Sequence, residues 1–162
     1  MMKTKAVVFD AYGTLFDVNS AAKRCKDKIG AKWEIFANFW RTTQLEYTWL
    51  RSLMKRHKNF WDITEDSLDK SMKVFNINKN MKNDLLGLYK ILTPYPEVRG
   101  VLEDLKKKNF KLAILSNGTH DLLNELVESN KLVNLFDDLF SIEEVKIYKP
   151  DPRVYELPAK KY

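Results

Sequence analysis

The stretch VVFDAYGTLFD, residues Val7 to Asp17, determines how the rest of the chain is interpreted. An apolar run ends abruptly at a single carboxylate, Asp10, and Gly13 and Thr14 follow soon after it. A short apolar run that is followed within a few residues by a glycine favours a buried strand leading into a tight loop. The sequence therefore predicts that a strand delivers Asp10 into this loop. The residue two places further on is Tyr12, so no second acid accompanies Asp10 there.

The composition predicts one compact domain that has room for a small inserted subdomain. The 162 residues are 44% hydrophobic and 12% aromatic, which is enough for a real core. The opening residues MMKTKAVVFD contain no long apolar segment, so we expect neither a signal peptide nor a membrane span. The single cysteine, Cys25, excludes an internal disulfide and favours the cytoplasm.

The net charge of +6 raises the question of a nucleic-acid partner. The basic residues stand in short clusters such as Lys106 to Lys108, and no finger, basic-region or RNA-binding motif accompanies them. Charge runs of this kind are typical of solvated surfaces, so we expect no nucleic-acid partner. Positive charge would still attract small anionic substrates.

Helical patterns fill the seventy or so residues after the first strand. The longest runs from Glu34 to Met54, where a stripe of apolar residues recurs at helical spacing: Phe36, Phe39, Trp40, Tyr47, Leu50 and Met54. Leu45 and Trp49 lie off this stripe, so another domain or a second subunit could cover their face. Trp40 and Trp49 are interpreted as packing residues. Thr64 is predicted to cap the start of the next helix.

Strand patterns return in the second half of the chain. The segment KLAILSNG, residues 111–118, is an apolar run with a polar end, and a helical pattern follows it. A third strand is expected at residues 139–142, before the loop KIYKPDPRVY. This rhythm predicts an α/β fold, with a Rossmann-like parallel sheet and an inserted helical cap. The core would comprise residues 1–17 and 96–162, and the cap residues 18–95.

Polar residues follow the predicted strands at the points where they end. Asp10 comes after the first strand, Ser116 and Asn117 end the second, and Lys149 lies in the loop after the third. Ligands of open α/β sheets bind at the carboxyl ends of the strands, so we expect these four side chains in one crevice. Asp10 alone could be a turn cap, and Lys149 alone a surface lysine. Their common placement favours a site.

These motifs resemble the haloacid dehalogenase superfamily. FDAYGTLFD together with SNG and YKPDP is similar, more narrowly, to the L-2-haloacid dehalogenases (type II). The segment FWRTTQLEYTWLRSLM, residues 39–54, resembles the first cap helix of that family, and LTPYP, residues 92–96, its return from cap to core. The resemblance extends from the first strand to Tyr155.

The resemblance implies a reaction and a role for each site residue. Asp10 would attack C2 of an (S)-2-haloalkanoate, and water would then hydrolyse the ester to an (R)-2-hydroxy acid. Arg41 would meet the halide or the substrate carboxylate, Lys149 would keep Asp10 ionised, and no metal or cofactor would be needed. Thr14 would support catalysis. The implied substrate-binding residues are Ala11, Tyr12, Arg41, Leu45, Phe60, Ser116, Asn117 and Tyr155.

Tyr12 favours a dehalogenase over the main alternative, a phosphatase of the same superfamily. Phosphatases of the superfamily carry an aspartate two residues after the nucleophile, where it protonates the leaving alkoxide, and they use Mg²⁺. Tyr12 cannot protonate an alkoxide in that way, whereas a departing halide needs no proton. Two alternatives stay open: a phosphatase of small metabolites, and a non-catalytic remnant acting as an interaction module through its cap helix. The same helix makes a homodimer plausible.

The resemblance also implies segments that this sequence does not include. The family continues with two more strands and a Ser-Asn-x-x-Asp-like segment whose aspartate activates the hydrolytic water, whereas this chain stops at VYELPAKKY. The sequence is therefore interpreted as truncated. Without the aspartate that activates water, the ester on Asp10 would form and persist, and the activity of this chain is in doubt. The strand Ala6–Phe9 would then be an open edge.

Overall fold

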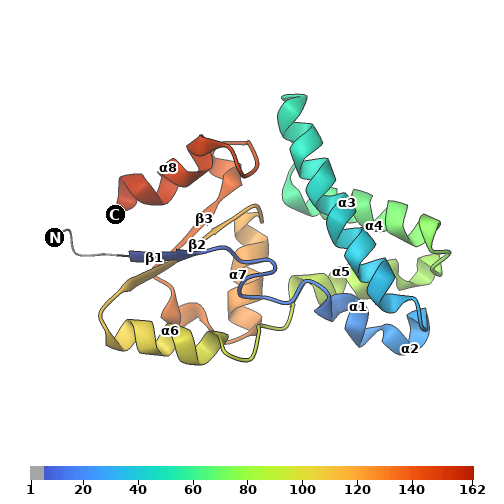
Figure 1. Ribbon diagram of the computed structural model, residues 1–162, viewed down its shortest axis with the longest axis horizontal. Helices are drawn as coiled ribbons and strands as arrows, with labels where there is room; N and C mark the ends of the chain where they lie inside the picture. Colours follow the sequence, from blue (N-terminus) through green and yellow to red (C-terminus); the bar gives the residue numbers. More distant parts are fainter. Residues whose placement is uncertain (1–5) are drawn as a thin grey trace.

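The computed structural model describes residues 6–162 and contains a three-stranded parallel sheet (Figure 1). The strands are β1 (Ala6–Phe9), β2 (Lys111–Ser116) and β3 (Asp138–Ser141), in the order β1-β2-β3. β2 lies between the other two and is buried after its first residue, which explains its continuous apolar sequence. The predicted α/β class is confirmed, and β1 is an edge strand within the described residues.

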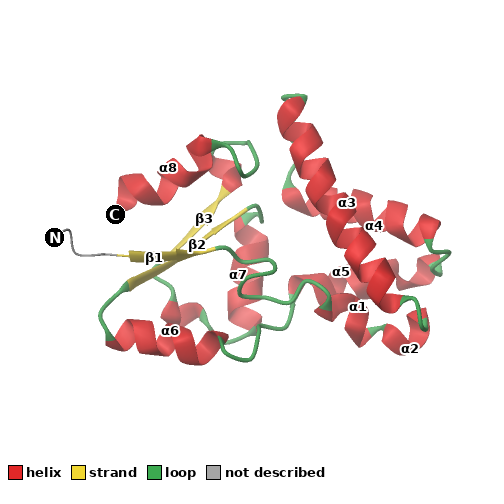
Figure 2. Cartoon of the chain, in the orientation of Figure 1, coloured by secondary structure: helices red, strands yellow, loops and turns green. Residues whose placement is uncertain are grey.

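Helices cover both faces of this sheet. α6 (Val98–Lys107) and α7 (His120–Ser129) lie on one side and α8 (Pro152–Lys161) on the other (Figure 2). Side chains at the N-caps fix where two of them begin: Thr119 accepts a hydrogen bond from the amide of Leu122, and Asp151 accepts one from that of Arg153. Short 3-10 turns at Val133–Leu135 and Ile142–Glu144 flank β3.

The remaining helices gather beside the sheet (Figure 1). They are α1 (Ser20–Arg24), α2 (Lys26–Ile29), α3 (Trp33–Leu53), α4 (Phe60–Val74) and α5 (Lys82–Lys90), with a 3-10 turn at Lys79–Met81. α3 and α4 pack along each other through buried apolar side chains such as Phe36, Trp40 and Leu68. The division at residues 17/18 and 95/96 stays a prediction.

The start of α4 corrects one expectation. Thr64 does not cap the helix, because α4 begins at Phe60 and Asn59 is its N-cap, accepting a hydrogen bond from the amide of Asp62 at 2.8 Å. Asparagine caps helices as well as threonine does. Thr64 instead lies in the second turn, where its hydroxyl donates to the Phe60 carbonyl at 2.7 Å.

The two segments that connect the helices to the sheet run side by side. The amide of Asp17 donates to the Thr93 carbonyl at 2.8 Å, and the amide of Tyr95 donates to the Leu15 carbonyl at 3.0 Å. Phe16 and Pro94 form an isolated antiparallel bridge between them. Because Leu15 and Phe16 belong to the loop that follows Asp10, these bonds fix the helices relative to that carboxylate.

Asp137, just before β3, ties the sheet to α6. Its carboxylate accepts hydrogen bonds from Lys111 Nζ at 2.8 Å, Lys106 Nζ at 2.9 Å and the Leu112 amide at 2.9 Å. These bonds, that of Lys111 above all, hold the pKa of Asp137 below its usual value. A carboxylate with a lowered pKa in the folded state stabilises the fold above its unfolded pKa, about 3.9. That stabilisation is lost as the pH falls through this value and below.

Asp137→Asn should therefore lower the free energy of unfolding by about 1–2 kcal/mol near neutral pH. The difference from the wild type should shrink in acid, because both proteins then carry an uncharged side chain at this position. Urea unfolding at neutral and acid pH measures this. Asp104→Asn is the control, since that exposed aspartate pairs only with Lys107. A difference that does not change with pH would contradict the assignment.

Candidate active site

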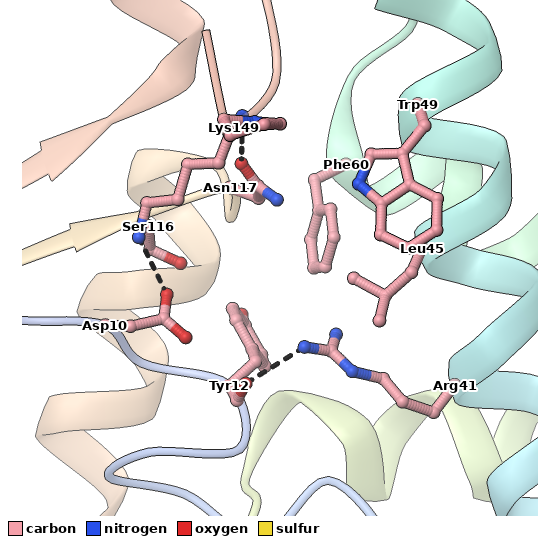
Figure 3. Close-up of a pocket in the computed structure, with 10 residues that line it drawn as sticks. Asp10, Tyr12, Arg41, Leu45, Trp49, Phe60, Ser116, Asn117 and Lys149 are labelled. Atoms are coloured by element: carbon pink, nitrogen blue, oxygen red, sulfur yellow. Dashed lines mark hydrogen bonds and ion pairs between the residues drawn. The ribbon is translucent and has the colours of Figure 1, made fainter. Parts of the chain in front are cut away.

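A pocket opens at the carboxyl ends of the strands, between the sheet and α3 (Figure 3). Its volume is about 530 Å³. Asp10 follows β1 directly, Ser116 is the last residue of β2, and Lys149 comes from the loop between β3 and α8. The complete lining is Asp10, Tyr12, Arg41, Leu45, Trp49, Phe60, Ser116, Asn117, Lys149 and Pro150.

Lys149 holds the carboxylate of Asp10 from one side. Its Nζ donates to Asp10 Oδ1 at 2.9 Å and also to the Leu115 carbonyl, while its backbone amide donates to Asn117 Oδ1 at 3.1 Å. The other carboxylate oxygen, Asp10 Oδ2, has only a long contact of 3.5 Å with the Thr14 hydroxyl. Lys149 therefore orients Asp10 and leaves Oδ2 as the oxygen that can react.

Arg41 reaches the pocket from α3. Its Nη2 donates to the Tyr12 carbonyl at 2.9 Å, and its Nη1 donates to Gln44 Oε1 at 2.9 Å. A guanidinium carries further N–H donors in a planar fork, which can bind an anion. Arg41 thus places a fixed positive charge across the pocket from Asp10, as Figure 3 shows.

The wall between Arg41 and Lys149 is apolar and aromatic (Figure 3). The Tyr12 ring lies 5.2 Å from the Phe60 ring, centroid to centroid, and Leu45 and Trp49 face them from α3. Burial holds the pKa of the Tyr12 hydroxyl well above its usual value, so this group stays protonated at neutral pH. The wall can take up an alkyl group, and Tyr12 places no carboxyl group two residues after Asp10.

Trp49 is a lining residue that the sequence interpretation placed in the packing. Its side chain is 48% exposed and borders the pocket. Leu45 and Trp49 stand four residues apart, so they share one face of α3. In the sequence, both residues lie off the main apolar stripe of this helix. That position could have indicated that their face of α3 lines a pocket.

Gly118 allows Tyr12 to reach its position. A Cβ atom at residue 118 would lie 2.8 Å from Tyr12 Cε2, closer than real Cβ contacts. Gly118→Ala should therefore push the ring into the pocket, destabilise the fold by about 1–3 kcal/mol and weaken substrate binding. Thermal unfolding and the substrate KM measure the two effects. Gly100→Ala is the control, because a Cβ there meets nothing within 4 Å; equal effects of the two substitutions would contradict this account.

Three residues expected at the site lie outside its lining. Ala11 is fully buried, Thr14 is exposed, and Tyr155 lies on α8 with 48% of its surface exposed. Their proposed roles stay predictions. Pro150 lines the pocket without having been predicted, and Gln44 contacts Arg41 from behind.

Neither histidine lies in the pocket lining. His57 Nε2 is 3.1 Å from Glu143 Oε2, and His120 Nε2 is 3.5 Å from Glu144 Oε1. Within residues 6–162, no three His, Cys, Asp or Glu side chains are grouped so that they could hold a metal ion. The helices of this part of the chain are too short or too polar to cross a bilayer.

Comparison with known proteins identifies the family. Residues 4–162 match the model of the haloacid dehalogenase-like hydrolases. The chain is 42% identical to (S)-2-haloacid dehalogenase 4A of Burkholderia cepacia over 154 residues, which cover 94% of this chain and 67% of that protein.

Solved structures agree with this match. The crystal structure of a dehalogenase superposes with a TM-score of 0.96 at 39% identity, covering 99% of this chain and 72% of that one. The L-2-haloacid dehalogenase of Xanthobacter autotrophicus, with chloropropionic acid covalently bound, gives a TM-score of 0.89 at 38% identity, covering 98% of this chain and 65% of that one. With its carboxylate, lysine and arginine around one pocket on this fold, the chain belongs to the family of haloacid dehalogenase-like hydrolases.

Proposed function

We propose that this protein displaces halide from (S)-2-haloalkanoic acids and yields (R)-2-hydroxy acids. The orientation of Asp10 supports this function most strongly. Lys149 Nζ donates a hydrogen bond to Asp10 Oδ1 at 2.9 Å, and Asp10 Oδ2 remains available next to the pocket. The related proteins from Burkholderia cepacia and Xanthobacter autotrophicus are named as 2-haloacid dehalogenases. The chain spans about two thirds of their length.

The first step would be a displacement at carbon. Asp10 Oδ2 attacks C2 on the side opposite the halogen, a carbon–oxygen bond forms, and the halide leaves with the electron pair of the carbon–halogen bond. C2 is inverted and an ester joins Asp10 to the substrate. In the second step, water adds to the carbonyl carbon of Asp10. The 2-hydroxy acid leaves with one proton of that water, the other is released, and the Asp10 carboxylate is restored.

The charged and polar side chains would bind the two anions of this reaction. The Arg41 guanidinium, which is weakly hydrated and always charged, suits the departing halide or the substrate carboxylate. Ser116 and Asn117, at the end of β2, would bind the carboxylate together with the loop at Ala11 and Tyr12. Leu45 and Phe60 would enclose the alkyl group.

Tyr12 favours carbon–halogen over phosphate-ester chemistry. A halide is a very weak base and leaves without a proton, whereas an alkoxide needs one from a positioned acid. The side chain two residues after Asp10 is a buried tyrosine whose pKa is raised by burial, so it is a much weaker proton donor than the carboxylic acid that the phosphatases carry there.

Two further properties are part of this proposal. α3 exposes Ile35, Leu50 and Leu53, and its C-cap exposes Met54, an apolar surface that suits pairing with a second copy of the chain. Sedimentation velocity would detect such a homodimer, and Leu53→Glu should shift it to monomer. The lone cysteine, Cys25, is unpaired and buried, which fits the reducing cytoplasm.

The test compares substrates of different chemistry. We expect chloride from (S)-2-chloropropionate, none from the (R) enantiomer, and no phosphate from p-nitrophenyl phosphate in the presence of Mg²⁺. Chloride-specific electrode readings and chiral analysis of the lactate measure both the rate and the inversion. Phosphate release without halide release would replace this function by that of a phosphatase. If the folded protein releases neither chloride nor phosphate, the remaining hypothesis is a non-catalytic protein that acts as an interaction module through its cap helix.

A further inference from the structure

A group of buried polar side chains lies behind Arg41, contributed by three helices. Gln44 of α3 is only 1% exposed, and Thr64 of α4 and Tyr89 of α5 are buried as well. None of the three lines the pocket. Buried polar groups need hydrogen-bond partners, and these find them in one another: Gln44 Nε2 donates to Thr64 Oγ1 at 2.6 Å and to the Tyr89 hydroxyl at 3.0 Å.

The direction of these bonds fixes the orientation of the Gln44 amide. The Thr64 hydroxyl uses its only hydrogen for the Phe60 carbonyl, at 2.7 Å, so its oxygen can only accept from Gln44. The NH₂ end of Gln44 must therefore face Thr64. The carbonyl end then faces Arg41 and accepts from Nη1 at 2.9 Å. A flipped amide would set its NH₂ against a guanidinium, and both groups only donate.

Tyr89 reinforces this arrangement and links it to the pocket wall. Its ring stacks on that of Tyr12, with centroids 5.6 Å apart and an interplanar angle of 13°, and lies 5.2 Å from the Trp40 ring. Burial raises the pKa of Tyr89, so its hydroxyl stays neutral and keeps both its donor and its acceptor role. The packed rings leave Gln44 little freedom to turn away from Arg41.

We infer that Gln44 is a positioning residue for Arg41, and that Thr64 and Tyr89 set its orientation. This inference rests on the proposed function. The bond from Nη1 to Gln44 and that from Nη2 to the Tyr12 carbonyl hold the guanidinium at two points. A long arginine side chain otherwise samples many rotamers, and ordering it during the reaction would cost free energy. The buried group orders Arg41 before the substrate binds.

Gln44→Met tests this directly, because methionine keeps the length of the side chain and removes the acceptor. We expect kcat/KM for halide release to fall by about 10–100-fold, with Thr64→Val and Tyr89→Phe producing smaller losses in the same direction. Ser71→Ala is the matched control. Ser71 is a buried hydroxyl on α4 that donates to the carbonyl four residues back at 2.7 Å, as Thr64 does, but it lies outside this group. Ser71→Ala should retain full activity.

Two further readouts separate positioning from general stability. In an Arg41→Ala background, Gln44→Met should cause no additional loss, because the residue acts through Arg41. In nitrogen-15 NMR spectra of the arginine side chains, the guanidinium of Arg41 should give restricted, resolved signals in the wild type. These signals should average in Gln44→Met and Thr64→Val and persist in Ser71→Ala.

The outcomes distinguish this inference from the proposed function. An equal loss from Gln44→Met with and without Arg41, or Arg41 signals that do not respond to Gln44→Met, Thr64→Val or Tyr89→Phe, would overturn the positioning role. If the wild type releases no halide while the Arg41 signals respond as described, the dehalogenase function fails and the ordering of Arg41 by Gln44 stands.

Discussion

Replacing Asp10 with asparagine should reduce halide release from (S)-2-chloropropionate by a factor on the order of 10³ or more. The amide has the size of the carboxylate but is neutral, and its oxygen is a far weaker nucleophile. The side chain of Asp10 lies within the pocket lining, with Oδ1 bound by Lys149 and Oδ2 available for reaction. Initial rates of chloride release measure the effect.

The fold should tolerate this substitution. Asparagine can still accept a hydrogen bond from Lys149 Nζ, which also keeps its bond to the Leu115 carbonyl. Asp17→Asn is the matched control, since Asp17 belongs to the same loop but does not line the pocket and accepts only the Asn19 amide through its side chain. Asp10→Asn with most of the wild-type rate would show that another group attacks the substrate.

Replacing Arg41 with leucine should lower kcat/KM by about 10²–10³-fold. In the proposed reaction the guanidinium would place a positive charge next to the departing halide or the substrate carboxylate, and leucine removes that charge while keeping some of the apolar bulk. Arg41→Lys should fall between leucine and the wild type. An ammonium keeps the charge but lacks the planar fork that binds the Tyr12 carbonyl and Gln44 together.

The control for Arg41 is another arginine on the same helix. Arg51 lies in the last turn of α3 and outside the lining of this pocket, so Arg51→Leu should leave kcat/KM close to the wild-type value.

Comparing substrates with chloride, bromide and iodide as leaving groups tests which anion Arg41 binds. If Arg41 stabilises the departing halide, its loss should slow the chloride most, because chloride is the poorest leaving group of the three. Equal losses for all three would assign Arg41 to the substrate carboxylate instead.

The convergence of Asp10, Ser116, Asn117 and Lys149 could be predicted because the carboxyl ends of parallel strands meet at one edge of a sheet. The spacing of apolar residues sufficed for the strands and for the long helix α3. These features depend on local patterns and on a general rule of sheet topology.

Other features depend on packing between elements, and the sequence carried no signal strong enough to find them. Three different helices contribute Gln44, Thr64 and Tyr89, so their spacing in the sequence does not indicate that they form hydrogen bonds with one another. The sequence pattern predicts the start of α4 at Thr64, whereas the helix begins at Phe60, which is buried in the packed structure, with Asn59 as its N-cap. Tyr155 lies on α8 outside the pocket lining, a placement that depends on how α8 packs and that local sequence patterns do not give.

The proposed reaction requires a covalent ester on Asp10, which mass spectrometry can detect. The protein is mixed with (S)-2-chloropropionate, quenched in acid within one turnover and digested for peptide mapping. We predict that the peptide containing Asp10 gains the mass of one 1-carboxyethyl group as chloride appears, and that Asp10→Asn shows neither. Chloride released without a mass gain on that peptide, or with the gain on another residue, would show that Asp10 is not the nucleophile.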